Sequence, residues 1–125
     1  VQNALFDLGS NLACESENRE KYNLPKVKAK ITKLLEESID DMDSDLEPLK
    51  NFILPGGCQS ATYAHICRTI ARRVERKLVA YFSSSPDSEP ENAIILLNRL
   101  SDYFFVLARF ENFNNRIVET NWKPS

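Results

Sequence analysis

Apolar residues recur at helical spacing along most of the chain. The first set is Val1, Leu5, Leu8 and Leu12. A second set lies within residues 24–42, at positions 27, 31, 34, 35, 39 and 42. Intervals of three and four residues predict amphipathic helices. Pro25 suits the first turn of the second helix, because proline there loses no helical hydrogen bond. The same spacing predicts a further helix over residues 60–82.

The segment "ENAIILLNRLSDYFFVLARF", residues 91–110, is apolar nearly all round. A helix of this kind is buried in a bundle. The polar, proline-containing segment at residues 83–91 predicts a linker before it. We expect the tail, residues 115–125, to be helical at first and then extended. No stretch shows useful strand alternation, so the pattern predicts an all-α fold, a bundle of four or five helices.

Composition and charge narrow the class of protein. A chain of 125 residues, 42% hydrophobic and 27% charged, suits a single helical-bundle domain over residues 1–125. The net charge of −2 provides no overall field to attract nucleic acid or an acidic membrane surface. No apolar run reaches the roughly 18 residues of a membrane span. We therefore expect neither nucleic acid nor membrane as a partner.

The cysteines and the histidine limit the chemistry further. Cys14, Cys58 and Cys67 are odd in number and form no CxxC pair, which indicates thiols in a reducing compartment. His65 is the only histidine. A zinc site or a Ser-His-Asp triad is hard to build from this set.

Basic residues gather in "AHICRTIARRVERKL", residues 64–78. On a helix turning about 100° per residue, Arg72 and Arg76 lie about 40° and 80° from Arg68, and Glu75 about −20°. These arginines border an expected core stripe, whereas Arg73 and Lys77 point elsewhere. The members of that stripe are Tyr63, Cys67, Ile70, Ala71, Val74 and Leu78.

Like charges at this spacing repel by roughly 0.2–0.5 kcal/mol per pair. Guanidinium groups beside an apolar seam need carboxylate or phosphate partners. Glu75 can supply one partner and a polyphosphate the rest. The alternative is a solvated face neutralised by acids from a neighbouring helix.

The buried helix carries three polar residues on one line. Asn98 and Asp102 are four residues apart, and Arg109 falls about 20° from Asn98. If buried, each needs a partner. Hydrogen bonds within the bundle would satisfy them equally well, and Asp102 could pair with Arg99 on its own helix.

The segments "NFILPGGCQSATYAHICRTIARRVERKL", residues 51–78, and "LNRLSDYFFVLAR", residues 97–109, closely resemble the PduO-type ATP:cob(I)alamin (corrinoid) adenosyltransferase family. A weaker similarity covers nearly the whole chain, including "VQNALFDLGSNLA" and the tryptophan-containing "ETNWKPS". The resemblance implies a five-helix bundle with ferritin-like up-down packing. It also implies a homotrimer with active sites between subunits.

The reaction implied by this resemblance transfers the 5′-deoxyadenosyl group of ATP to the cobalt of cob(I)alamin, with Mg²⁺. Adenosylcobalamin and triphosphate are the products. The cobalt is the nucleophile, so no catalytic side chain is expected, and the protein would position C5′ over the metal and stabilise triphosphate charge. The alternative is a catalytically silent helical bundle that binds corrinoid or a partner protein.

The resemblance also implies roles for individual residues. The residues that match the ATP site are Arg72, Arg76, Glu75 and Asn98. Arg68 matches an arginine in an intersubunit salt bridge. Phe52 matches the aromatic residue at the lower face of the corrin, which helps to exclude the axial base and leaves a four-coordinate cobalt that is easier to reduce. No side-chain ligand for a metal is identified.

The sequence departs from the family pattern at its start. The family begins with a segment similar to "TKTGDxGxT", which wraps the ATP phosphates, and continues with a helix carrying "DELN". The sequence given has neither and begins at the segment after them. Without them we expect weak ATP binding and a missing acidic partner for Arg68. The resemblance further implies the cytoplasm, or the mitochondrial matrix in a eukaryote, and as further partner a cobalamin reductase or a cobalamin-dependent enzyme.

Overall fold

The computed structural model describes residues 1–84 and 91–124. Its elements are α1 (Gln2–Ala13), the 3₁₀ turn η1 (Ser16–Asn18), the single-turn α2 (Arg19–Tyr22), α3 (Ala29–Asp43), α4 (Gln59–Ser83) and α5 (Glu91–Asn114). Within the described ranges the only extended pairing is an isolated antiparallel bridge between Ile53 and Asn121. The predicted all-α fold is confirmed. No helix in the described part of the chain is long and apolar enough to cross a membrane.

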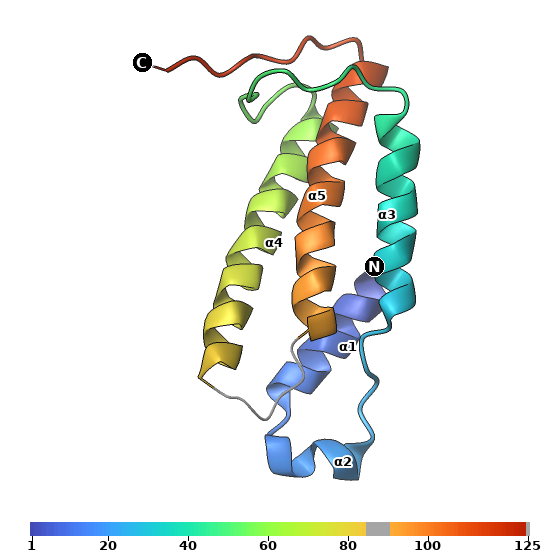
Figure 1. Ribbon diagram of the computed structural model, residues 1–125, viewed down its shortest axis with the longest axis vertical. Coiled ribbons are helices and arrows are strands. Elements are labelled where there is room, and N and C mark those ends of the chain that lie inside the picture. The colour runs from blue at the N-terminus through green and yellow to red at the C-terminus, as the bar shows by residue number, and fades with distance from the viewer. Residues whose placement is uncertain (85–90, 125) are drawn as a thin grey trace.

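Helix α5 lies between α3 and α4 (Figure 1). Helix α4 runs antiparallel to α5, while α3 runs in the same direction as α5. Helix α1 packs beside the half of the bundle in which α5 begins. The loop of residues 44–58 and the tail of residues 115–124 meet over the other end, where α3 and α5 end and α4 begins.

Buried side chains form three clusters along α5, and α5 contributes to each of them. One joins Leu8 and Leu78 to Ala93 and Leu97. The second joins Leu35 to Leu96 and Leu100. The third consists of Ala61, Ala64 and Ala108, whose small side chains let α4 and α5 approach closely. The prediction of a buried helix at residues 91–110 is therefore confirmed.

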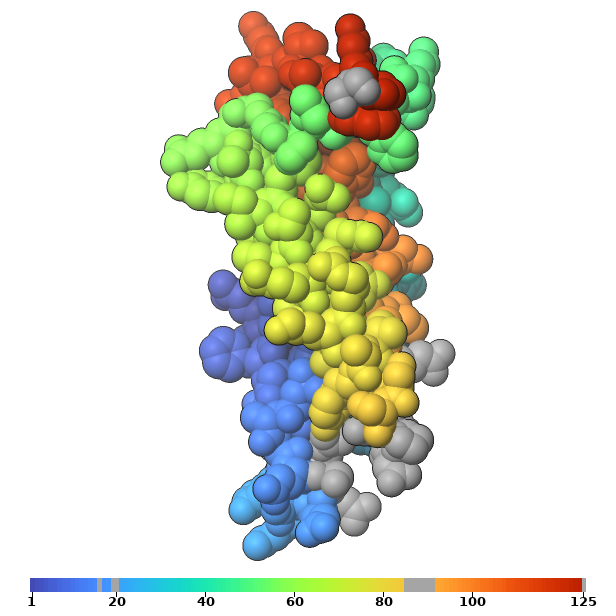
Figure 2. Space-filling model, turned by 90° about the vertical axis from the view of Figure 1, so that its left-hand side faces the viewer, coloured from blue at the N-terminus to red at the C-terminus, as the bar shows by residue number. Residues whose placement is uncertain are grey.

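The core stripe predicted for α4 is wrong on one side. Tyr63 is 58% exposed, Ile70 is 44% exposed and Cys67 is exposed. The buried residues of α4 are instead Ala61, Ala64, His65, Ala71 and Leu78. Contact with α5 is made largely by alanines, which carry little weight in a hydrophobic pattern. Tyr63, Ile66 and Ile70 are larger, and they are exposed instead. Figure 2 faces the side of the molecule on which α4 lies.

Two predicted boundaries also differ from the structure. Helix α3 begins at Ala29 after an extended Lys28, so Pro25 precedes the helix and does not occupy its first turn. Helix α5 ends at Asn114, and Arg116 adopts a left-handed φ of 55°. Such a residue terminates a helix, so the tail is not helical at first. Most of the predicted linker, residues 85–90, lies outside the described residues.

Candidate functional site

Arg72 and Arg76 lie one turn apart on an exposed face of α4. Among the described residues, no carboxylate forms an ion pair with either guanidinium group. The alternative of a face neutralised by acids from a neighbouring helix is thus not what this chain shows at these two positions. Two unneutralised cations on one helix face can bind an anion of several charges.

A polar contact between helices lies beside these arginines. The side-chain amide of Asn98 on α5 donates a 2.9 Å hydrogen bond to Oε1 of Glu75 on α4. Both residues are half-buried. Asn98 therefore has a partner inside the bundle. The partner of Glu75 is Asn98, whereas the sequence had suggested that Glu75 pairs with an arginine of α4. The contact fixes the position of a carboxylate within one turn of both Arg72 and Arg76.

Arg68 lies on the buried side of the same helix. Its Cζ atom is 5.8 Å from the centre of the Phe105 ring, a cation–π arrangement. Its Nε is buried and has no hydrogen-bond partner within the described part of the chain. Arg68 thus separates from Arg72 and Arg76, although the three are evenly spaced in sequence.

His65 lies next to Arg68 and is only 4% exposed. Neither ring nitrogen has a hydrogen-bond partner among the described residues, and the ring packs edge-on to Phe105 at 6.4 Å. Burial lowers the pKa of His65 below 6.5, and the charge of Arg68 lowers the pKa further, against a smaller opposing effect of Glu119. The imidazole is therefore neutral at pH 7.

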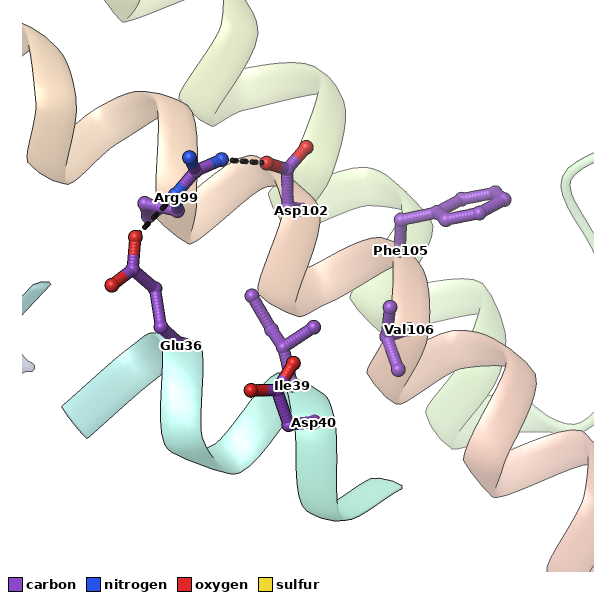
Figure 3. Close-up of a pocket in the computed structure, with 7 residues that line it drawn as sticks. All are labelled: Glu36, Ile39, Asp40, Arg99, Asp102, Phe105 and Val106. Carbon is purple, nitrogen blue, oxygen red and sulfur yellow. Dashed lines mark hydrogen bonds and ion pairs between the residues drawn. The ribbon is translucent and has the colours of Figure 1, made fainter. Parts of the chain in front are cut away.

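A shallow cavity of about 530 Å³ lies between α3 and α5 (Figure 3). Arg99 spans it, with its Nε 2.8 Å from Glu36 and Nη1 2.9 Å from Asp102. These hydrogen bonds raise the pKa of Arg99. The pairing of Asp102 with Arg99, one of the possibilities left open by the sequence, is confirmed. Phe105 points from this cavity toward α4, where it meets Arg68.

Arg109 is 7% exposed and ties α5 to three other segments. Its Nη2 donates a 2.7 Å bond to the carbonyl of Glu47, and its Nε a 3.3 Å bond to Glu119 in the tail. Its Nη1 lies 3.8 Å from Asp43 at the end of α3. These contacts hold the end of α3, the loop after it and the tail against α5.

Phe52 lies in the loop before α4 and is 77% exposed. Its ring packs edge-on to Trp122, at 6.3 Å between centroids and 76° between planes. Both rings line a surface cavity of about 400 Å³. The exposure argues against Phe52 as an anchor buried in the bundle. Because Arg72 and Arg76 lie 13 and 17 residues after Gln59, the first residue of α4, they are about 20 and 25 Å along the helix from the end at which Phe52 lies.

Two features of the site were not found from the sequence. The contact of Phe52 with Trp122 depends on a bridge between residues almost 70 positions apart. Asn112, which is 2% exposed, bonds to the turn before α4 across more than 50 residues. An asparagine near a helix end gives no sequence signal of such long-range bonds. Phe52 and Trp122, which flank the bridge, stand out in the sequence as aromatic residues, but nothing there indicates that they meet.

No group of three or more histidine, cysteine, aspartate or glutamate side chains among residues 1–84 and 91–124 could hold a metal ion.

Comparison with known proteins places these features in a family. Residues 1–111 match the sequence model of the family described as cobalamin adenosyltransferase. A corrinoid adenosyltransferase of Bacillus subtilis (strain 168) is 40% identical over 125 residues, covering 100% of this chain and 62% of the relative. A Homo sapiens corrinoid adenosyltransferase is 39% identical over 112 residues, covering 88% of this chain and 44% of the relative.

Solved structures of PduO-type ATP:corrinoid adenosyltransferases are also similar to this chain. A phenylalanine-to-alanine variant of a PduO-type ATP:corrinoid adenosyltransferase from Lactobacillus reuteri, complexed with cobalamin and ATP, superposes with a TM-score of 0.88. It is 35% identical, and the match covers 98% of this chain and 66% of that one. An arginine-to-lysine variant complexed with ATP gives 0.83 at 34% identity, covering 98% of this chain and 66% of that one. The chain thus spans less than two thirds of the length of these proteins.

Proposed function

Because the chain belongs to the cobalamin adenosyltransferase family, we propose that the protein transfers the 5′-deoxyadenosyl group of ATP to cob(I)alamin. The bond between C5′ and the triphosphate oxygen breaks, and a bond between C5′ and cobalt forms. The electron pair of the new bond comes from cob(I)alamin, and triphosphate leaves with the pair of the broken bond. The products are adenosylcobalamin and triphosphate.

The observation that carries this proposal is the pair of exposed, unneutralised arginines on α4, Arg72 and Arg76. Triphosphate gains charge as its bond to C5′ breaks, and guanidinium groups placed for it beforehand stabilise that charge. The hydrogen bond from Asn98 holds Glu75 in a fixed place beside them. We assign these four residues to the ATP site. Mg²⁺ would neutralise part of the phosphate charge when bound.

The chain does not need a catalytic nucleophile for this reaction, because the corrinoid cobalt attacks C5′ directly. The work left to the protein is to bind the two substrates, to orient C5′ over the metal and to keep the phosphates in place. Phe52 is assigned to the corrin. Its 77% exposure at the mouth of a surface cavity leaves its ring available to a large planar ligand.

We further propose a homotrimer with its active sites between subunits, in which Arg68 pairs with an acidic residue of a neighbouring subunit. The support is a set of large apolar side chains on α4 that are exposed in the single chain. Its members are 44–58% exposed: Tyr63, Ile66, Ile70 and Tyr81. For this chain, sedimentation should give about three times 14.3 kDa. A monomer at micromolar concentration would contradict the trimer.

The remaining parts of the proposal concern the setting of the reaction. Cob(I)alamin must be supplied by reduction, so a cobalamin reductase is the expected upstream partner, and a cobalamin-dependent enzyme the expected recipient of the product. The expected location is the cytoplasm, or the mitochondrial matrix if the host is a eukaryote.

Steady-state adenosylation by the intact protein tests the ATP assignment, with Arg73→Ala as the matched control for Arg72→Ala. Both arginines are exposed on α4 and adjacent in sequence, but their side chains lie about 100° apart around the helix. Loss of a bond to a charged group is worth about 1.5–3 kcal/mol. Arg72→Ala should therefore raise the apparent constant for ATP about tenfold or more, or abolish turnover. Equal kinetics for the two variants would refute the assignment.

A further inference from the structure

Asn112 joins two segments that lie far apart in sequence. Its Oδ1 accepts a 2.9 Å hydrogen bond from the backbone N–H of Cys58, and its Nδ2 donates a 3.1 Å bond to the carbonyl of Gly56. Its own carbonyl accepts a 2.8 Å bond from the N–H of Ile117. One residue on α5 therefore holds both the turn before α4 and the start of the tail.

The turn is shaped around this side chain. Gly57 has a φ of +111°, which side chains other than glycine rarely adopt. A Cβ atom added at Gly57 would overlap the Asn112 amide. Asn112 is itself only 2% exposed. The glycine and the amide thus fit each other closely, and the turn cannot shift without breaking two hydrogen bonds in a buried place.

The two segments held by Asn112 carry the exposed aromatic pair. The N–H of Leu54 bonds to the carbonyl of Thr120 at 2.8 Å, and the N–H of Trp122 to the carbonyl of Phe52 at 2.7 Å. These bonds place the Phe52 and Trp122 rings 6.3 Å apart. Phe52 is 77% exposed and Trp122 49%, so the bundle core does little to hold either ring. Their positions depend on the backbone of the loop and the tail.

We propose that Asn112 is a positioning residue for the corrinoid site. It fixes the turn and the tail relative to each other, and thereby sets the distance and angle between the Phe52 and Trp122 rings. The expected effect on corrinoid binding rests on the proposed function, because that proposal assigns Phe52 to the corrin. The inference is drawn from the contacts of Asn112 in this chain, a residue just beyond the part matched by the family's sequence model, residues 1–111.

The chain supplies a matched control at the neighbouring position. Ser60 donates a 2.6 Å hydrogen bond to Oε2 of Glu111, and this bond joins the same two helices at the same end of the bundle. The Ser60 hydroxyl also lies 3.3 Å from the Sγ atom of Cys58, but Ser60 forms no side-chain bond to the backbone of the Gly56–Cys58 turn or to the tail in the described chain. A role in stability alone would be shared by Ser60 and Asn112. A role in placing the two rings belongs to Asn112 only.

The fluorescence of Trp122 provides a readout that needs no substrate, because Trp122 is the only tryptophan in the sequence. In the ligand-free protein, Asn112→Ala should shift the emission to the red and increase quenching by acrylamide, and Phe52→Ala should do the same. Ser60→Ala should leave both unchanged. If Asn112→Ala does not fold, Asn112→Asp serves instead, because it keeps the acceptor for Cys58 and replaces the donor to Gly56 with an oxygen that the Gly56 carbonyl repels.

Kinetics with chemically reduced cob(I)alamin then test the consequence. The apparent constant for cob(I)alamin should rise about tenfold in the Asn112 variant, equivalent to about 1.4 kcal/mol, with that for ATP unchanged. Unchanged fluorescence in a folded variant would overturn the positioning role, whatever the activity. Altered fluorescence with an unchanged corrinoid constant would overturn its link to corrinoid binding. Lack of adenosylation by the wild type would instead reject the proposed function, while altered fluorescence would still support the placement of the rings by Asn112.

Discussion

Asn98 and Glu75 join α5 to α4 through a 2.9 Å hydrogen bond between half-buried side chains, within one turn of Arg72 and Arg76. Glu75 carries the only carboxylate on α4, and one oxygen of that carboxylate accepts this bond. Glu75 therefore stands beside the arginines without forming an ion pair with either of them in the described chain.

We predict that Asn98→Ala weakens ATP binding and lowers stability. The freed carboxylate of Glu75 can turn to an arginine and compete with the triphosphate. A double-mutant cycle of Asn98→Ala with Glu75→Ala, measured by urea unfolding, should give a coupling of about 0.5–1.5 kcal/mol. A coupling near zero would mean that the hydrogen bond contributes nothing in solution.

Phe52→Ala should separate function from stability. With 77% of the residue exposed, its removal should change the free energy of unfolding by no more than about 0.5 kcal/mol. Adenosylation starting from cob(II)alamin should slow, and the spectroscopic signal of four-coordinate cob(II)alamin with ATP bound should fall. A large loss of stability with a normal four-coordinate signal would exclude the corrin role.

The state of His65 predicts how stability depends on pH. Burial and Arg68 hold its pKa below 6.5 in the folded chain, so the unfolded chain binds the proton more readily. The lowered pKa therefore contributes to the free energy of unfolding. This contribution is fully present above pH 6.5 and is lost as the pH falls from 6.5 toward the folded pKa, at no more than about 1.4 kcal/mol per pH unit. Chemical unfolding of His65→Gln should show a flatter dependence than the wild type in this range. Identical slopes would show that His65 does not titrate differently on folding.

Arg109 and Arg99 form a matched pair on α5, because each contacts two carboxylates. Arg109 is buried, whereas the Arg99 side chain is 40% exposed. Arg109→Ala should therefore lower the free energy of unfolding by about 2–3 kcal/mol, since it leaves the Glu47 carbonyl and Glu119 without their donor. Arg99→Ala should lower it by at most about 1 kcal/mol. Similar losses in thermal unfolding would contradict the structural role of Arg109.

The long helices could be predicted because their signals are local. Residues 60–82 and 91–110 lie within α4 and α5, and the periodicity that placed Arg72 and Arg76 on one face depends only on helix geometry. The buried line of α4 could not be predicted in the same way. It runs through Ala61, Ala64 and Ala71, where close packing against α5 matters more than hydrophobicity.

The loop and the tail were beyond local reasoning for a different reason. Their conformation depends on bonds between distant residues, such as that of Trp122 with Phe52, and on a left-handed Arg116 that ends α5. Arginine has no preference for that conformation. Only the assembled chain, with Asn112 accepting from Ile117, shows why the helix stops there.

Analysis of the reaction products is the direct test of adenosyl transfer. The intact protein should be incubated with ATP, Mg²⁺ and cob(I)alamin in the absence of oxygen, and the products separated by chromatography. The account predicts adenosylcobalamin and triphosphate in equal amounts, with Arg72→Ala greatly reduced and Arg73→Ala close to the wild type. Corrinoid binding without adenosylcobalamin formation, or release of pyrophosphate in place of triphosphate, would contradict it.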